Sequence, residues 1–162
     1  MFSRLVRMFL VIAVFVFAVS TVTAQLPNPY GTPIGIDAAK KAAAAAVAEA
    51  KKNQFTMAIA VVDTAGNLVY FEKMDGTQMA SVTIAVDKAR SAALFKRPTK
   101  ALQDGLAAGG VGLRFLALQG AVPVEGGVPI LLDGKIVGAI GASGGTSDQD
   151  GVCASAGANT FK

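Results

Sequence analysis

Apolar and polar residues alternate along residues 37–162 with two different periods, which predict a succession of helices and strands. An alanine-dominated segment over 38–52 has strong helix propensity, with Asp37 as its expected N-cap. A second helix is predicted over 81–95, because small apolar residues recur there every three or four positions before Pro98. Four short apolar runs bounded by turn residues predict strands over 55–62, 68–71, 128–132 and 135–142.

The connections between these elements favour an antiparallel arrangement. Asp133-Gly134 is a strong two-residue hairpin signal, and a turn over 63–67 joins the first two strands. Between the two hairpins, Thr99 is expected to cap a short turn that ends at Leu102, and residues 107–120 are glycine-rich and irregular. Hairpins joined by helices predict an α+β fold with an antiparallel sheet, and not a parallel nucleotide-binding sheet.

The segment 137–145 predicts a buried strand that runs into a glycine turn. Gly138 and Gly141 leave room for another backbone to approach closely. Gly144 and Gly145 are expected to adopt backbone angles that other residues avoid, so that the chain turns sharply. Such a turn is a common part of ligand sites and also of ordinary connections.

A last helix is predicted from this turn to about residue 161. Thr146 or Ser147 would cap it, and its first turn carries acidic residues, the sign of charge favoured at a helix N-terminus. Gln149 and Asp150 would be capping residues by default. Their position after two glycines also makes them site candidates, because free backbone amides there could hold a carboxylate.

Residues 1–24 have the pattern of a secretory signal peptide. Arg4 and Arg7 precede an unbroken apolar run over 8–19, and small residues lead to an expected cleavage after Ala24. A membrane anchor is the alternative, although the apolar run is shorter than the roughly 20 residues that span a bilayer. The protein is therefore expected to be exported, to the periplasm or the extracellular space.

The remaining chain is expected to form one domain. Residues 25–36 are rich in proline and glycine and predict an extended leader, and 37–162 suits a single domain with its own core. The net charge of +4 includes Arg4 and Arg7, so removal of the signal leaves 13 of 15 Lys and Arg against 11 Asp and Glu. Because no basic cluster is interleaved with aromatic residues, we expect no nucleic-acid partner. After removal of the signal, we also expect no stable membrane insertion of the mature chain.

The absence of histidine restricts the chemistry further. A His-based triad, the usual zinc sites and imidazole ligation of iron are excluded, so we expect no metal site of these kinds. The single cysteine, Cys153, allows no intrachain disulfide. Inside an apolar helix it is expected to be a buried small residue, with a reactive thiol as the alternative.

An ordered set of motifs covers the region from Asp37 to Gly157. The motifs are Ala60-Val61-Val62-Asp63 with Gly66, Lys73-Met74-Asp75-Gly76, Asp87-Lys88-Ala89, Ala92 to Thr99, Gly126-Gly127-Val128-Pro129-Ile130, Asp133-Gly134, and Val137 to Gly145 with Gln149-Asp150. Together they resemble the GlcG/HbpS-like haem-binding and haem-degrading family, which includes the C-terminal domain of PduO-type proteins. The resemblance implies a profilin-like fold, a central antiparallel sheet of about five strands flanked by helices, and assembly into homo-oligomers.

The resemblance also implies a small-molecule ligand, with haem as the expected cofactor. Haem needs cations for its propionates, and Lys88, Arg97 and Lys96 are candidates for that role. Phe71, Phe95 and Phe115 could line an apolar slot. In place of a histidine ligand to iron, the chain could offer Met74, Met79 or Tyr70.

Each candidate also has a structural interpretation. Asp75 could orient a ligand or simply form a turn before Gly76. Lys88 could be a solvated lysine in the middle of a helix, and Arg97 could stabilise a helix C-terminus. The expected ligand-binding residues are Met74, Asp75, Lys88, Arg97, Gly144, Gly145, Gln149 and Asp150; no catalytic residue is assigned.

Three functions remain open at this point. The first is an exported haem- or tetrapyrrole-binding protein that scavenges, buffers or senses redox state. The second is an enzyme or accessory protein for a small organic acid such as glycolate, with Arg97 and the Gly144-Gly145 turn holding the carboxylate and Asp75 or Asp150 as base. The third is a structural oligomer whose alanine- and glycine-rich elements pack between subunits.

Overall fold

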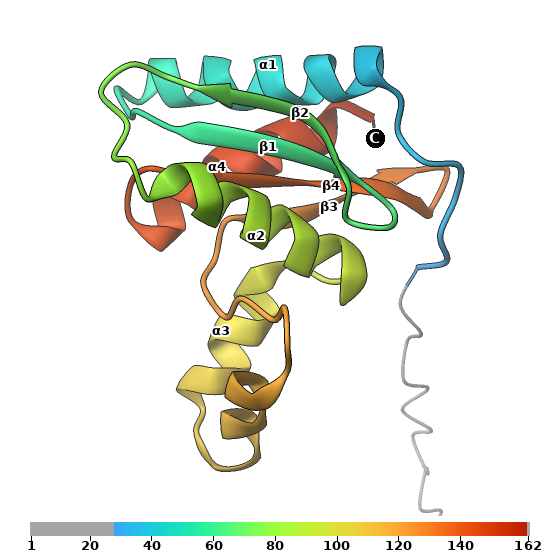
Figure 1. The fold of residues 1–162 in the computed structure, drawn as a ribbon, viewed down its shortest axis with the longest axis vertical. Coiled ribbons are helices and arrows are strands. Elements are labelled where there is room, and N and C mark those ends of the chain that lie inside the picture. Colours follow the sequence, from blue (N-terminus) through green and yellow to red (C-terminus); the bar gives the residue numbers. More distant parts are fainter. Residues whose placement is uncertain (1–27, 162) are drawn as a thin grey trace, which may run out of the picture.

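The computed structural model describes residues 28–161 (Figure 1). The predicted signal peptide, residues 1–24, lies outside this range. In chain order, the elements are α1 (Ile36–Lys52), β1 (Ala58–Asp63), β2 (Leu68–Lys73), α2 (Ser81–Leu94), α3 (Thr99–Ala107), the 3-10 helix η1 (Gly110–Ala117), β3 (Gly127–Leu132), β4 (Lys135–Ser143), α4 (Ser147–Ala158) and the 3-10 helix η2 (Asn159–Phe161). Within these residues, no helix has both the length and the apolar character needed to cross a bilayer.

The strands form one antiparallel sheet in the order β2-β1-β4-β3. Helices α1 and α4 cover one face of the sheet and α2 covers the other (Figure 1). The predicted α+β fold is confirmed, although the sheet of the described chain has four strands where about five were expected. The hairpin at Asp133-Gly134 is also confirmed, with positive φ values of 49° and 71° at its two residues, as a type I′ turn requires.

The predicted leader is paired with the sheet over its described part. Tyr30 forms a parallel bridge with Ile136 of β4. The amide of Ile136 donates to the Pro29 carbonyl (2.8 Å), the amide of Gly31 donates to the Ile136 carbonyl (2.8 Å), and that of Ile34 donates to the Val137 carbonyl (2.7 Å). The leader thus extends the sheet beside β4, beyond the point where the β1 pairing stops at Gly138.

Helix α1 begins at Ile36, two residues earlier than the sequence suggests. Its N-cap is Gly35, and Asp37 lies in the first turn and makes no capping hydrogen bond. The four lysines of this helix, which the sequence places on its solvent-facing side, are all exposed: Lys40, Lys41, Lys51 and Lys52.

The two faces of the sheet have different cores. On the α1 and α4 side, large side chains such as Met57, Ile59 and Ile140 pack against alanines. On the α2 side, the packing consists almost entirely of alanine and valine. A Cβ at Gly141 would lie 2.0 Å from the carbonyl oxygen of Ala85, so only glycine lets α2 lie this close to β4. The predicted close approach at Gly141 is therefore confirmed.

Helix α3 and η1 form a lobe below the sheet (Figure 1). The expected short turn from Thr99 to Leu102 is instead a helix of 9 residues. At its start, the Thr99 hydroxyl accepts the Gly127 amide (2.9 Å), which ties α3 to β3. Within the lobe, Gly112 of η1 packs directly against the Gly105 carbonyl of α3, and no space remains there for a Cβ on residue 112. It exposes four apolar side chains by 42% or more: Val111, Leu113, Leu116 and Leu118.

Candidate functional site

The fold divides the predicted site residues between two ends of the molecule. Met74-Asp75 follows the end of β2, and Gly144-Gly145 follows the end of β4; both strands pair there with Ala58 of β1. Arg97 lies at the opposite end of α2, a helix of 14 residues and therefore roughly 20 Å long. One ligand of small size cannot contact both groups.

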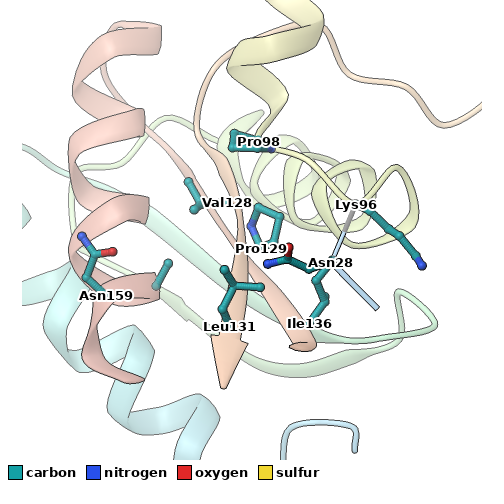
Figure 2. Close-up of a pocket in the computed structure, with 9 residues that line it drawn as sticks. Asn28, Lys96, Pro98, Val128, Pro129, Leu131, Ile136 and Asn159 are labelled. Atoms are coloured by element: carbon teal, nitrogen blue, oxygen red, sulfur yellow. The ribbon is translucent and has the colours of Figure 1, made fainter. Parts of the chain in front are cut away.

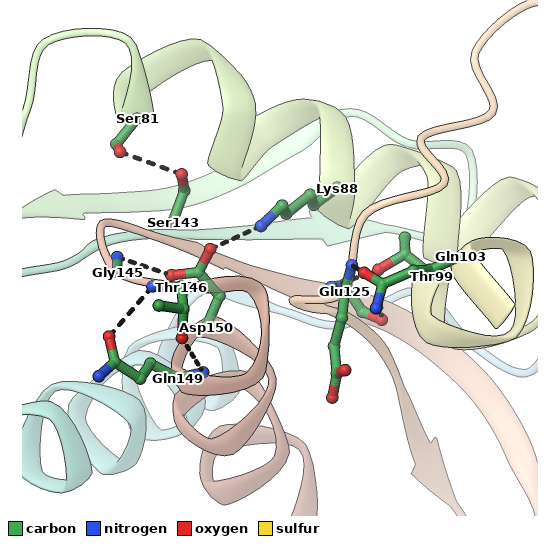
Figure 3. A network of polar contacts seen from close by, with 11 residues as sticks. Ser81, Lys88, Thr99, Gln103, Glu125, Ser143, Gly145, Thr146, Gln149 and Asp150 are labelled. Atoms are coloured by element: carbon green, nitrogen blue, oxygen red, sulfur yellow. Dashed lines mark hydrogen bonds and ion pairs between the residues drawn. The ribbon is translucent and has the colours of Figure 1, made fainter. Parts of the chain in front are cut away.

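Lys88 and Asp150 form a buried ion pair between α2 and α4 (Figure 3). Lys88 Nζ lies 2.7 Å from Asp150 Oδ2, and the two side chains are 1% and 4% exposed. The second oxygen, Oδ1, accepts the Gly145 amide at 3.0 Å. The interpretation of Lys88 as a solvated lysine is therefore wrong, because its ammonium is enclosed and faces a carboxylate on a helix from the other side of the sheet.

Glycines shape the space around this pair. Gly126, with φ of 127°, lies so close that a Cβ there would be 2.9 Å from Lys88 Nζ and 2.8 Å from Asp150 Cβ. Burial raises the pKa of Asp150, while the hydrogen bonds from Lys88 and the Gly145 amide act in the opposite direction. The pair connects α2 to α4 and, through the Gly145 amide, to the turn that follows β4; neither residue lines the cavities described below.

The start of α4 is a capping box, as the sequence suggests. The Thr146 hydroxyl accepts the Gln149 amide at 3.4 Å, and Gln149 Oε1 accepts the Thr146 amide at 3.0 Å (Figure 3). The expectation of unusual backbone angles at Gly144 and Gly145 is wrong, since neither has a positive φ. Gly144 needs glycine for space, because a Cβ there would meet the Thr56 carbonyl; a Cβ at Gly145 would meet Gln149 Oε1, the end of a side chain that can shift.

Met74 and Asp75 line an open polar hollow at the end of β2. Its volume is about 400 Å³, and its other lining residues are Lys51, Glu72 and Lys73. Of the other candidate iron ligands, Met79 is 80% exposed. The Tyr70 hydroxyl donates to Glu72 Oε2 at 3.1 Å, and this hydrogen bond raises the pKa of Tyr70. No group of three or more Cys, Asp or Glu side chains within residues 28–161 is placed to hold a metal ion.

A second, mainly apolar cavity lies beside edge strand β3 (Figure 2). We call it the edge cavity; its volume is about 230 Å³, and it is lined by Asn28, Lys96, Pro98, Val128, Pro129, Leu131, Ile136, Ala158 and Asn159. The leader, the α2–α3 connection, the second hairpin and the end of α4 all contribute. The sequence analysis missed this cavity, because no local pattern connects four segments so far apart in the chain.

Lys96 lies at the rim of the edge cavity, and Arg97 follows it in the chain without lining the cavity. The Lys96 side chain lies at one edge of the lining residues, with Nζ 4.1 Å from the centre of the Tyr30 ring (Figure 2). Arg97 is exposed, and its Nε donates to the Phe95 carbonyl at 3.0 Å. Within the described residues, neither cation forms an ion pair with a carboxylate. The three phenylalanines expected to form a slot, Phe71, Phe95 and Phe115, line none of the cavities described here.

Glu125 is a polar group that the sequence analysis did not single out. Its Oε2 atom is buried and has no hydrogen-bond partner, although Lys100 Nζ lies 3.7 Å away. Burial raises the pKa of this carboxyl group, and Lys100 partly offsets the effect. The Glu125 side chain lies against α4 at Gly151, where a Cβ would meet Glu125 Oε1.

Comparison with known proteins gives consistent matches over this domain. Residues 34–159 match the family described as haem degrading protein HbpS-like. The chain is 38% identical over 100 residues to Protein GlcG of Escherichia coli K12, covering 62% of this chain and 73% of GlcG. A crystal structure of a double mutant of HbpS from Streptomyces reticuli is 33% identical, with a TM-score of 0.74 over 82% of this chain and 89% of that chain. A PduOC–haem complex is 25% identical, with a TM-score of 0.71 over 81% of this chain and 98% of that chain.

Proposed function

The chain belongs to the family of haem degrading HbpS-like proteins, and on this premise we propose that it is an exported protein that binds haem or a related tetrapyrrole. The family match and the similarity to a PduOC–haem complex support haem as the ligand. Residues 1–24 support export, through their positive start, apolar run and small residues before Ala24.

The observation that carries the proposal is the mainly apolar edge cavity with Lys96 at its rim and Arg97 next to Lys96 in the chain. Haem is a flat apolar ring system with two carboxylates along one side. Val128, Pro129 and Leu131 offer apolar contact, and Lys96 and Arg97 are available as partners for the propionates. Of the cations suggested by the sequence, these two fit the role, whereas the Lys88 ammonium is enclosed with Asp150.

The size of the edge cavity limits how a tetrapyrrole would bind. Its volume of about 230 Å³ is below the roughly 300–1,000 Å³ of sites that enclose a drug-sized ligand. A tetrapyrrole would therefore insert one edge and leave most of the ring outside. Since the chain has no histidine, iron ligation by imidazole is also excluded, and binding would rest on apolar contact and the propionates.

Assembly of several copies would supply further contacts for such a ligand. The lobe exposes the apolar side chains of Val111 by 81% and of Leu116 by 68%, and such side chains are candidates for a contact between copies. We therefore propose that the protein forms homo-oligomers. Light scattering coupled to size-exclusion chromatography measures the number of subunits, and a monomeric mass at micromolar concentration would contradict this part of the proposal.

The alternative of an enzyme for a small organic acid has less support from the geometry. It required Arg97 to hold a carboxylate beside a base such as Asp150. Asp150 is instead buried on Lys88, and Arg97 lies beyond the far end of α2. Asp75, the other candidate base, lies in the polar hollow at the opposite end of the sheet from Arg97.

Hemin titration followed by Soret absorbance tests the proposed function. The chain from Gln25 onward is expected to give a saturable spectral shift, and Arg97→Ala is expected to weaken binding by about tenfold, since a hydrogen bond to a charged group contributes on the order of 1.5–3 kcal/mol. Lys40→Ala, at an exposed position on α1, is the control and should bind as the unmodified chain does. A spectrum equal to that of hemin with an inert protein would refute the proposal.

A further inference from the structure

We propose that the carboxyl group of Glu125 is a pH-sensitive switch that controls how firmly the lobe is attached to the rest of the domain. With a proton, this group lies against α4 and fixes the return segment, residues 118–126, which leads from the lobe back to β3. Without the proton, it is repelled from this place and the lobe loosens. The inference does not depend on haem binding.

Glu125 connects the lobe to the last helix. Its amide donates to Gln103 Oε1 of α3 at 2.7 Å, and its side chain lies against α4 at Gly151. On the α2 side, Lys88 and Asp150 pair with each other, and Figure 3 shows the Glu125 side chain pointing away from that pair. The charges that act on the Glu125 carboxyl group therefore come from α3 and α4.

The Glu125 carboxyl group has an oxygen that is poorly suited to a negative charge. Its Oε2 atom is buried and has no hydrogen-bond partner. Lys100 Nζ lies 3.7 Å from this oxygen but only 2.9 Å from Asp104 Oδ1, so the ammonium is bound first to Asp104. A buried carboxylate without donors is costly, whereas the protonated group carries no charge. The surroundings of Oε2 thus favour the protonated form.

Two further carboxylates act in the same direction. Asp148 on α4 and Asp104 on α3 place negative charge near Glu125, and together with burial they raise its pKa, while Lys100 lowers it. When all three groups are ionised, one ammonium faces three carboxylates. A proton on Glu125 removes the excess charge that is also the most buried, and so relieves the repulsion between the return segment and α4.

The return segment has one other side-chain attachment to the body of the domain, among the hydrogen bonds of residues 28–161. The Val122 amide donates to the Ser91 hydroxyl of α2 at 3.0 Å. Helix α3 is tied to β3 at its first residue, where Thr99 accepts the Gly127 amide. Displacement of Glu125 would therefore leave the lobe attached at its two ends on the α2 and β3 side, without its contact to α4.

The direction of the pH effect follows from the raised pKa. The folded chain binds this proton more tightly than the unfolded chain does, so the attachment is present in full below the ordinary value of 4.5 and is lost as pH rises through the raised value. Amide hydrogen exchange, corrected for the intrinsic rate at each pH, measures the opening of α3. In the chain from Gln25 onward, protection of the α3 amides should fall by about tenfold between pH 4.5 and pH 7, the effect of one pKa unit.

Three variants isolate the role of Glu125. Glu125→Gln keeps the shape of the side chain and cannot ionise, so protection of α3 at pH 7 should stay at its pH 4.5 level. Asp148→Asn removes one like charge and should reduce the pH effect. Asp37→Asn, at an exposed position on α1, is the control and should keep the full effect. Carboxyl ¹³C NMR of the unmodified chain follows the ionisation of Glu125 directly.

The outcomes decide the inference in either direction. Titration of Glu125 above pH 4.5, together with a pH effect on α3 that Glu125→Gln abolishes, would support it. Titration of Glu125 at or below pH 4.5 would overturn it, and so would an equal pH effect in Glu125→Gln and the unmodified chain. If Glu125→Gln does not fold, the NMR titration and Asp148→Asn decide, and an unchanged pH effect in Asp148→Asn would overturn the inference. None of these readouts involves hemin, so the proposed function can fail while this inference holds.

Discussion

Lys88 and Asp150, which are 62 residues apart in the chain, meet at 2.7 Å in the interior and join helices from opposite faces of the sheet. Removing one partner of a buried ion pair leaves the other charge uncompensated, at a cost of about 3–5 kcal/mol. Lys88→Met is therefore expected to lower the free energy of unfolding by that amount, measured by urea denaturation at pH 7.

The double variant Lys88→Met/Asp150→Leu separates the charge from the packing. Apolar residues of similar size often replace a buried pair with little loss, so the double variant should recover most of the stability. The control is Lys52→Met, which removes an exposed, solvent-screened pair with Glu49 (3.3 Å) and should leave the free energy of unfolding almost unchanged. If Lys88→Met and Lys52→Met lower the free energy of unfolding by the same amount, the buried pair has no special role in stability.

Gly141→Ala tests the close contact between α2 and β4. The new Cβ would lie 2.0 Å from the Ala85 carbonyl oxygen, and backbone atoms cannot move aside as a flexible side chain can. We expect a loss of about 3 kcal/mol in the free energy of unfolding. Gly35→Ala is the comparison, since a Cβ there meets nothing within 4 Å, and it should change stability by less than about 1 kcal/mol.

The strain at Lys96 can be measured apart from its side-chain contacts. Lys96→Gly and Lys96→Ala both remove the contact with Tyr30, but only glycine adopts a φ of 54° without cost. Lys96→Gly should therefore be more stable than Lys96→Ala by about 1 kcal/mol. Equal stabilities in urea denaturation would show that the left-handed backbone carries no strain at this residue.

Cys153 gives the protein a defined dependence on alkaline pH. Burial raises the pKa of its thiol from 9.0 to about 11. The unfolded chain loses this proton first, so stability contributed by the neutral thiol is present in full below pH 9 and declines as pH rises towards 11. Between pH 7 and pH 10, the unmodified chain should lose about 1.4 kcal/mol more than Cys153→Ala does.

A thiol reagent provides an independent check on the same residue. The Cys153 side chain is fully buried, so the native protein should not react with it at pH 8, whereas the protein in urea should react at once. Rapid modification of the native chain would show that the thiol is accessible and would contradict the assigned burial.

The sequence predicts the sheet and its helices well, because each depends on local signals. The turn at Asp133-Gly134, the cap at Thr146 and the burial of Cys153 can each be recognised within a few neighbouring residues, and the structure confirms all three. The family resemblance, carried by short motifs in the right order, is confirmed by the match over residues 34–159.

Features that depend on distant contacts could not be predicted in this way. Nothing near Lys88 in the chain indicates that its ammonium would be enclosed, since its partner arrives on another helix. The tie between α3 and β3 likewise depends on the contact between Thr99 and Gly127, 28 residues away. The edge cavity has the same origin, because its walls come from both ends of the described chain.

The alanine and glycine contact between α2 and β4 has a consequence for how such a protein can diverge. Positions such as Ala85 and Gly141 have no space for a larger side chain, so substitutions there damage the fold before they change a ligand. Besides the second hairpin, the walls of the edge cavity come from the leader, the α2–α3 connection and the end of α4 with η2, and sequence change costs less in such connecting segments. Descendants of one ancestor could thus acquire different ligands by altering these peripheral segments while the sheet and its helices stay the same.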